Sequence, residues 1–285
     1  MNGKKVIGID LGGTNVRAGI VDHNKLGDVT SVRIHSDGTV DEVMDDLYGL
    51  VDQVIDSSVE AIGIGVPSVV DADAGIVYDV QNIPSWKEVH LGKLMEDRYK
   101  VPVLVNNDAN CFALGEKYFG KGKDAHSMVG LIIGTGMGAG LVVNDHLYAG
   151  PNCGAGEFGM VDYLDKYYEF YASGQFFEHV HRTTGETVYQ NASNGDQTAL
   201  EIFEELGVHI GNAMKMILYT FDPELVILGG SVSNAYQYFE KSMWNRIRTF
   251  AYSKSLEKFR IEVSELDNCG VLGAAALYYD SRKAR

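Results

Sequence analysis

The chain has 285 residues, which is enough for one large domain or two of ordinary size. Its hydrophobic content of 45% and charged content of 22% are those of a globular protein and exclude disorder and low complexity. The net charge of −15 argues against a nucleic-acid partner and against an anionic membrane surface, because both bind basic faces.

The cysteines and the N-terminal residues indicate the compartment. Three cysteines, far apart in the sequence, form no disulfide framework and no Cys-x-x-Cys metal site. This pattern fits a reducing setting, so we expect a cytoplasmic protein. Asp10 interrupts the apolar stretch after Lys4 and Lys5, which is unlike a signal peptide, and runs such as 61–70 are far shorter than the ~20 residues of a membrane span.

Strands and helices alternate along the chain, which predicts α/β layers. The helix at 41–57 has the clearest pattern, because apolar residues recur at helical spacing and Thr39 with Glu42 forms a capping box. The expected strands are 6–9, 16–21, 61–66, 101–105, 129–133, 140–143, 225–228 and 260–263. The other expected helices are 91–99, 108–119, about 169–183, 197–221, 235–250 and one from residue 270 onward.

Two of the expected hairpins are similar in sequence. Shifting residues 7–21 by 121 positions matches five of fifteen residues. Duplication of a half-chain and chance similarity between two glycine-rich hairpins explain these matches equally well.

The first glycine cluster follows an apolar strand, in Ile7-Gly-Ile-Asp-Leu-Gly-Gly-Thr-Asn15. Exposed N–H groups at Gly12 and Gly13 form a nest for an anion such as phosphate. Asp10 beside them suits Mg²⁺ held through water, because Mg²⁺ prefers oxygen ligands. A plain hairpin turn accounts for the same residues, so this cluster alone does not decide between the two readings.

The second glycine cluster is Gly134-Thr-Gly-Met-Gly-Ala-Gly140, whose backbone is also able to wrap a phosphate. It matches the relaxed dinucleotide-binding fingerprint, but that fingerprint requires a helix to follow. Leu141-Val-Val143 and then Asn144-Asp145 predict a strand and a turn instead, so we reject the dinucleotide reading. The sequence also contains no G-x-x-x-x-G-K-[ST] motif, which excludes a P-loop.

Three further segments carry polar or glycine residues where ligands bind in α/β proteins. Asn106-Asn-Asp-Ala-Asn110 lies between an expected strand and a helix, and Asp108 is either a functional carboxylate or the helix N-cap. Glu157 stands among glycines in Gly154-Ala-Gly-Glu-Phe-Gly159. Leu225–Ser231 predicts a buried strand that runs into a Gly-Gly turn, a shape that admits a flat base but also occurs at ordinary strand ends.

The order of these motifs resembles the ROK family (repressor, open reading frame, kinase) of sugar kinases, in the actin-like ATPase and hexokinase superfamily. The resemblance runs from Ile7 to about Leu277. It rests on Ile9-Asp-Leu-Gly-Gly-Thr14, Asn107-Asp-Ala-Asn110, Ala113-Leu-Gly-Glu116, Gly134-Thr-Gly-Met-Gly138, Gly156-Glu-Phe-Gly159, Tyr171-Ala-Ser-Gly174, Asp222-Pro and Leu228-Gly-Gly230.

The resemblance implies an α/β, two-domain actin-like ATPase (ribonuclease H-like) fold with a central cleft. The implied domains are 1–112, with the C-terminal helix at about 270–285 packing back on it, and 113–269. The implied activity is ATP-dependent phosphorylation of a hydroxyl of a hexose or an N-acetylated amino sugar, as in a glucokinase. The implied cofactors are ATP and Mg²⁺, and the implied assembly is a homodimer.

The resemblance also assigns individual residues. Asp108 corresponds to the catalytic base, and Asp10 lies near the metal and the phosphates. The implied sugar contacts are Asn82, Asn107, Asp108, Glu157 and Glu169. The implied nucleotide contacts are Asp10, Gly12, Gly13, Thr14, Gly134, Thr135, Gly136, Gly229 and Gly230. This set agrees with phosphoryl transfer, which needs positioning, charge stabilisation and one carboxylate to take the hydroxyl proton.

The sequence departs from the family pattern at the sugar side. The family has Glu-x-Gly-His and a Cys-x-Cys-Gly-x-x-Gly-Cys zinc loop, whereas this chain has Met160 and only Asp162–Tyr168 before Glu169. We therefore expect no zinc, a loop held by packing of Tyr163, Leu164, Tyr167 and Tyr168, and a Met160 side chain that fills space without donating a hydrogen bond. We also expect a sugar preference shifted away from glucose, or a raised KM for glucose.

Two other functions compete with the kinase. The first is a sugar-binding repressor; the early first strand and the charge of −15 argue against DNA binding. The second is a non-catalytic sugar sensor, which the loss of the family His and zinc loop favours and the retained Asp108 and glycine loops oppose. We favour the kinase, because phosphate-binding loops are explained by a transferable phosphate.

Overall fold

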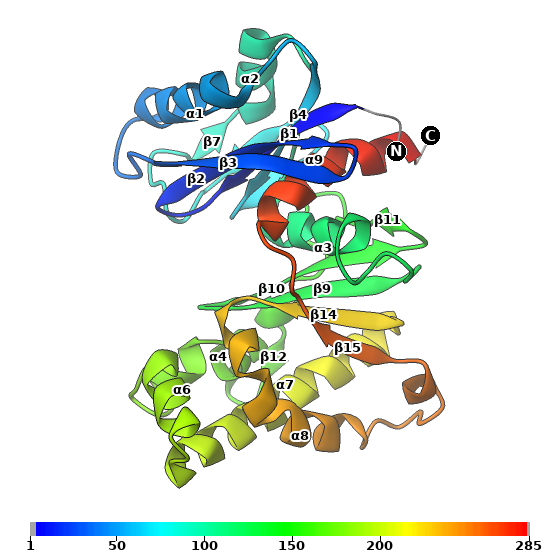
Figure 1. Cartoon of the computed structure of the whole chain (residues 1–285). Coiled ribbons are helices and arrows are strands. Elements are labelled where there is room, and N and C mark those ends of the chain that lie inside the picture. The colour runs from blue at the N-terminus through cyan, green and yellow to red at the C-terminus, as the bar shows by residue number, and fades with distance from the viewer. Residues whose placement is uncertain (1–3, 284–285) are drawn as a thin grey trace. The chain divides into compact units, whose positions relative to one another are not determined.

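The computed structural model describes residues 4–283, which form two compact units (Figure 1). The first unit contains residues 4–124, 140–155 and 265–283, and the second contains 125–139 and 156–264. The domain limits of 1–112 with about 270–285, and 113–269, stay a prediction, and their outermost positions, 1–3 and 284–285, lie outside the described residues.

The first unit is built on a mixed five-stranded sheet in the order β3-β2-β1-β4-β8. The strands are β1 (Lys5–Leu11), β2 (Asn15–Asp22), β3 (Lys25–Arg33), β4 (Val59–Val66) and β8 (Val103–Asn107). β1, β4 and β8 run parallel, β2 is antiparallel to β1, and β3 is antiparallel to β2. The register places Gly65 beside Asp10 on one side and beside Asn106 on the other. The polar residues therefore lie together at the carboxyl ends of the parallel strands β1, β4 and β8.

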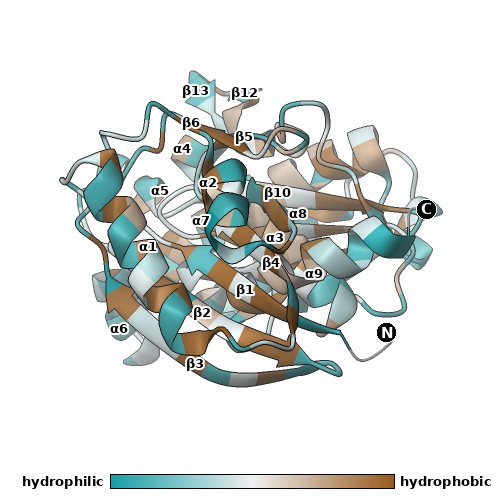
Figure 2. Cartoon of the chain, turned by 90° about the horizontal axis from the view of Figure 1, so that it is seen from above, coloured by the Kyte–Doolittle hydropathy of each residue, from teal (hydrophilic) through white to brown (hydrophobic). Residues whose placement is uncertain are grey.

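The helices of the first unit follow the sequence patterns closely. They are α1 (Val40–Val54), α2 (Leu91–Tyr99), α3 (Asp108–Tyr118) and α9 (Cys269–Lys283), with a small sheet of β5 (Val69–Asp71), β6 (Ile76–Tyr78) and β7 (Glu88–Val89). The predicted capping box is present: Thr39 Oγ1 accepts from the Glu42 N–H, and Glu42 accepts from the Thr39 N–H. Figure 2 shows β1 and β2 in largely hydrophobic colours, in keeping with their burial.

Helix α9 packs on the first sheet through glycines. Gly8 of β1 lies against the backbone of α9 at Val271, and Gly63 of β4 lies against it at Ala274. The α9 residues 271–280 are buried. The C-terminal helix therefore forms part of the core of the unit that contains the N-terminal strands.

The second sheet has the order β11-β10-β9-β14-β15. Its strands are β9 (Met128–Ile133), β10 (Met137–Val143), β11 (His146–Leu147), β14 (Leu225–Gly229) and β15 (Arg260–Val263). β9, β14 and β15 run parallel, as β1, β4 and β8 do, and β11 is antiparallel to β10, as β3 is to β2. The strand order therefore repeats that of the first sheet, β3-β2-β1-β4-β8. The repeated topology favours duplication, which the sequence matches alone left undecided.

The remaining elements belong to the second unit. They are the 3₁₀ turns η1 (Phe158–Met160), η2 (Ser231–Ala235) and η3 (Ser255–Glu257), the hairpin of β12 (Asp162–Tyr163) and β13 (Lys166–Tyr167), and the helices α4 (Tyr168–Ala172), α5 (Gln175–His179), α6 (Gly185–Ser193), α7 (Gln197–Phe221) and α8 (Tyr236–Ile247). The expected bounds of α7 are confirmed. The helix expected at 169–183 is wrong, because Ser173 and Gly174 interrupt it.

None of the helices in residues 4–283 is both long enough and apolar enough to cross a membrane.

Candidate functional site

In the first unit, the predicted residues gather where the parallel strands end. Asp10 lies at the end of β1, and the three-residue turn Gly12–Thr14 connects β1 to β2. The Gly12 N–H donates to the carbonyl of Asn15 at 2.9 Å, which closes this turn. Asn82 comes from the loop before β7 and lies against Gly13, since a β-carbon on Gly13 would be 2.6 Å from the Asn82 amide nitrogen.

The start of α3 separates the roles of two neighbouring residues. Asn107 is the N-cap: its Oδ1 accepts from the Ala109 N–H at 2.9 Å, and its Nδ2 donates to the Ser68 carbonyl at 3.2 Å. Asp108 is the first helical residue and is half-buried. The alternative in which Asp108 is the N-cap is therefore wrong, and the helix dipole at this position favours an ionised carboxylate.

Asp10 has a basic partner that sequence reasoning missed. A terminal nitrogen of Arg17, on β2, donates to Asp10 Oδ2 at 2.6 Å. Arg17 faces Asp10 across the antiparallel pair β1–β2, which the hairpin pattern was able to show. Asp10 also rests on Gly270, where a β-carbon would be 2.7 Å from its carboxyl carbon.

In the second unit, the turn Gly134–Gly136 connects β9 to β10 and is held by the segment after α4. The Gly134 N–H donates to the Gly136 carbonyl at 2.9 Å. The Gly174 N–H donates to the Gly134 carbonyl at 2.7 Å, and the fully buried Ser173 hydroxyl donates to the Thr135 carbonyl at 2.9 Å. These bonds explain why the chain breaks its helix at Ser173-Gly174.

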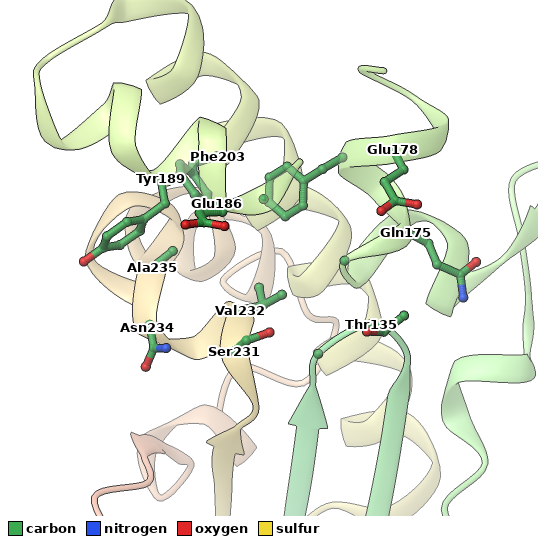
Figure 3. Close-up of a pocket in the computed structure, with 14 residues that line it drawn as sticks. Thr135, Gln175, Glu178, Glu186, Tyr189, Phe203, Ser231, Val232, Asn234 and Ala235 are labelled. Atoms are coloured by element: carbon green, nitrogen blue, oxygen red, sulfur yellow. The ribbon is translucent and has the colours of Figure 1, made fainter. Parts of the chain in front are cut away.

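A cavity of about 670 Å³ opens beside this turn (Figure 3). The tip of the β9–β10 hairpin brings Thr135 to it, and the segment after β14 brings Ser231 and Val232. Helices α5, α6 and α7 supply the rest of the wall. The full lining is Gly134, Thr135, Gly174, Gln175, Phe177, Glu178, Gly185, Glu186, Tyr189, Phe203, Ser231, Val232, Asn234 and Ala235. Its volume lies in the range of small-molecule sites, about 300–1,000 Å³.

Of the predicted nucleotide residues in the second unit, some line this cavity and others do not. Gly134 and Thr135 line it. Gly230 directly precedes its lining residue Ser231, has a φ of 84° and lies tight against the backbone of Ile133. Gly229 is buried at the end of β14, and Gly136 faces Glu169. The aromatic and acidic lining residues were missed, because they come from three helices that no motif connects.

The predicted carboxylates Glu157 and Glu169 belong to the same unit and interact. Gly156 and Gly159, which lie before and after Glu157 in the sequence, pack tightly against the backbone of β10 and so hold Glu157 at this place. Glu157 is exposed as a residue, but neighbouring atoms partly desolvate its carboxyl group. This desolvation raises the pKa of Glu157, and the negative charge of Glu169 raises it further. Glu169 Oε2 accepts from the Met137 N–H at 2.8 Å.

The hairpin β12–β13 occupies the place of the family's zinc loop. Tyr163 stacks on Tyr168 with ring centroids 4.3 Å apart. The Tyr163 hydroxyl accepts from Asn212 Nδ2 at 2.7 Å and lies 3.1 Å from His209 Nδ1, both on α7. Burial lowers the pKa of His209, which favours the neutral imidazole, the form able to accept from this hydroxyl. Packing of the tyrosines is therefore confirmed, but Leu164 is 68% exposed and contributes little.

Two further observations concern Met160 and the metal-binding side chains. Met160 is 57% exposed, so within its unit it does not fill space as expected. In residues 4–283, no three His, Cys, Asp or Glu side chains are grouped as metal ligands. The absence of zinc stays a prediction.

We expect a chelator to leave the thermal unfolding of the protein unchanged, because aromatic packing and not zinc holds the hairpin. Tyr163→Ala should instead lower the free energy of unfolding by about 2 kcal/mol, since it removes the stacked ring and two hydrogen-bonding contacts. Calorimetry with and without EDTA checks both results, with the exposed Tyr252→Ala as the matched control. One zinc per chain by elemental analysis would contradict this account.

Comparisons with known proteins agree with this arrangement. The chain is 31% identical to the N-acetyl-D-glucosamine kinase of Pectobacterium atrosepticum, over 95% of this chain and 98% of the relative. It is 29% identical to the xylose repressor of Bacillus subtilis, over 85% of this chain and 67% of the relative. The crystal structure of a ROK family glucokinase from Streptomyces griseus, in complex with glucose and AMPPNP, superposes with a TM-score of 0.78 at 27% identity and covers 96% of this chain and 98% of that one.

These neighbours share the α/β fold of the actin-like ATPases, and the fold class expected from the motifs is confirmed. The model of the ROK family matches residues 6–281, which is nearly the whole chain. The chain therefore belongs to the ROK family.

Proposed function

We propose that this chain is an ATP-dependent sugar kinase that transfers the γ-phosphoryl group to a hydroxyl of a hexose or an N-acetylated amino sugar. The observation that carries the proposal is the cavity of about 670 Å³ beside the turn Gly134–Gly136. Its lining combines a glycine turn with the aromatic rings of Phe177, Tyr189 and Phe203, as a phosphate and a flat base require. The kinase and glucokinase relatives support the same reading.

In the proposed reaction, Asp108 takes the proton of the attacking sugar hydroxyl. Asp108 lies in the first turn of α3, where the helix dipole favours the carboxylate form that accepts a proton. Asn82, Asn107, Glu157 and Glu169 are the proposed sugar contacts, although the Asn107 side chain already caps α3 and contacts the Ser68 carbonyl. The hydroxyl oxygen then attacks the γ-phosphorus, and ADP leaves with the electron pair of the broken P–O bond.

The residues present fit Mg²⁺ that arrives with the nucleotide. Mg²⁺ in nucleotide sites is bound by one or two carboxylates, water and substrate phosphates. Asp10, beside the turn Gly12–Thr14, supplies one such carboxylate, and it is steadied by Arg17. Bound there, the ion would neutralise phosphate charge.

The alternative function is sugar binding without catalysis, as in a regulator, and the xylose repressor relative favours it. Binding and turnover separate the two functions. A regulator binds sugar and releases no ADP, whereas a kinase releases ADP only when sugar and ATP are both present.

We further propose a cytoplasmic homodimer without nucleic-acid or membrane partners.

We expect Glu157→Gln to remove sugar phosphorylation and to stabilise the fold near neutral pH. The pKa of Glu157 is raised in the folded state, so the folded protein binds its proton more tightly and loses stability as pH rises from the ordinary value of 4.5 through the folded pKa. Glutamine carries no such cost. Unfolding of both proteins across this pH range checks the sign, and equal stability of the two at neutral pH would contradict it.

We expect Met160→His to improve the use of glucose. Methionine cannot donate to a sugar hydroxyl, and one regained hydrogen bond is worth about 1 kcal/mol, or roughly a fivefold lower KM. Steady-state kinetics on glucose test this, with Met160→Leu as the control that changes shape without adding a donor. Tight and fast phosphorylation of glucose by the wild type would contradict the expected shift in preference.

A further inference from the structure

Gln175 lines the cavity and is also hydrogen-bonded to Glu169. As the first residue of α5, it lines the cavity beside Thr135 and Gly174 (Figure 3). Its Nε2 also donates to Glu169 Oε1 at 2.7 Å. A glutamine amide has two N–H donors and one carbonyl acceptor, so a ligand in the cavity and Glu169 are able to share it.

Glu169 is likewise bonded on both carboxylate oxygens. Oε1 accepts from Gln175, and Oε2 accepts from the Met137 N–H at 2.8 Å, at the end of the turn Gly134–Gly136. A β-carbon on Gly136 would be 2.6 Å from Oε2, so this turn closes directly onto the carboxylate. The position of Glu169 is therefore determined by a cavity residue and by the glycine turn together.

The Glu169 carboxylate also interacts electrostatically with Glu157, a second proposed sugar contact. The charge of Glu169 acts on the Glu157 carboxyl, so a movement of Glu169 changes the electrostatic environment of Glu157. Both carboxylates are sugar contacts in the proposed function, whereas Gln175 is on the nucleotide side.

We propose that Gln175 is a positioning residue through which a nucleotide in the cavity orients the Glu169–Glu157 pair for the sugar. This inference rests on the proposed function. A nucleotide that hydrogen-bonds the Gln175 amide fixes its orientation, which strengthens its bond to Glu169 and pre-orders the sugar contacts. The affinity for sugar is then higher when nucleotide is bound than when it is absent, and by linkage the reverse holds equally.

The test uses three variants of the full chain. Gln175→Met keeps the length of the side chain and removes the donor, and Gln175→Lys restores a donor of similar reach. Gln197→Met is the matched control, because Gln197 Nε2 donates to Glu201 Oε1 at 3.1 Å on an exposed helix start outside the cavity. The first readout is the ¹³C carboxyl NMR signal of Glu169, identified by its loss in Glu169→Gln, with and without AMPPNP.

We expect the Glu169 signal to move in Gln175→Met without ligand and to stop responding to bound AMPPNP, while Gln175→Lys and Gln197→Met respond as the wild type does. We also expect the sugar KM of Gln175→Met to rise about tenfold, the loss of one hydrogen bond to a charged group, with a smaller change in kcat. An unchanged Glu169 signal, or a rise in sugar KM that is equal in Gln197→Met, would overturn the inference.

The same experiment separates this inference from the proposed function. A wild type that binds no AMPPNP contradicts the kinase, while the ligand-free comparison of Glu169 signals still decides whether Gln175 holds that carboxylate. A wild type that is an active kinase but shows an unaltered Glu169 signal on binding AMPPNP overturns the role of Gln175 alone.

Discussion

Asp108→Asn should lower kcat for sugar phosphorylation by about 10²–10⁴-fold, the usual span for loss of a general base. Asparagine keeps the shape of the side chain and an oxygen acceptor, so α3 still begins at the same place. The cap itself is supplied by Asn107 and is not affected. What is lost is the ability to accept the hydroxyl proton, so kcat should fall while sugar binding is retained.

The matched control for this variant is Asp41→Asn. Asp41 also lies in the first turn of a helix, α1, and is exposed. Both substitutions remove a negative charge from a helix start, which costs about 0.3–1 kcal/mol of folding stability. Asp41→Asn therefore shows how far this loss alone changes kcat, and the additional fall in kcat in Asp108→Asn reports the loss of the base. A purified, folded Asp108→Asn protein with near wild-type kcat would contradict the assignment of the base.

Gly63→Ala should destabilise the first unit more than most single substitutions. A β-carbon on Gly63 would overlap the carbonyl oxygen of Ala274, which is backbone of α9 and cannot rotate away. The helix has to move off the sheet, and overpacking of this kind costs about 1–3 kcal/mol and occasionally more. We expect a lower midpoint in urea unfolding followed by circular dichroism.

Gly49→Ala provides the comparison within the same unit. Gly49 lies in α1, and apart from its chain neighbours and the adjoining helix backbone no atom is within 4 Å of the place where its β-carbon would be. Alanine there should stabilise the protein by roughly 0.5–1 kcal/mol, because it has the higher helix propensity. If the two variants unfold at the same urea concentration, close packing of α9 on β4 is not what holds the unit together.

The sequence predicts an element well where local chemistry decides it. The periodicity of α7 and the capping box of α1 are local, and both were predicted. β3 was not expected, because its sequence, KLGDVTSVR, alternates polar and apolar residues weakly and it is largely exposed. The break at Ser173-Gly174 was not expected either, since it depends on bonds to the distant turn Gly134–Gly136.

The same distinction applies to the site. Glycine turns and the Asp108 segment are contiguous motifs, so the sequence was able to indicate them. The walls of the cavity were not predictable in this way, because Phe177, Tyr189 and Phe203 meet only once α5, α6 and α7 have packed. Gln175 was missed because its contact with Glu169 depends on how α4 and α5 pack and belongs to no motif. Arg17 was missed although its place opposite Asp10 follows from the register of the β1–β2 hairpin.

Sugar-dependent ADP release by the full chain with MgATP measures the proposed kinase activity directly. The panel is glucose, mannose, fructose, allose and the N-acetyl amino sugars, each with and without the protein and with Asp108→Asn in parallel. We predict ADP release that depends on at least one of these sugars and that falls about 10²–10⁴-fold in the variant. Binding of a sugar by calorimetry with no sugar-dependent ADP release from any member of the panel would contradict the kinase and leave the regulator.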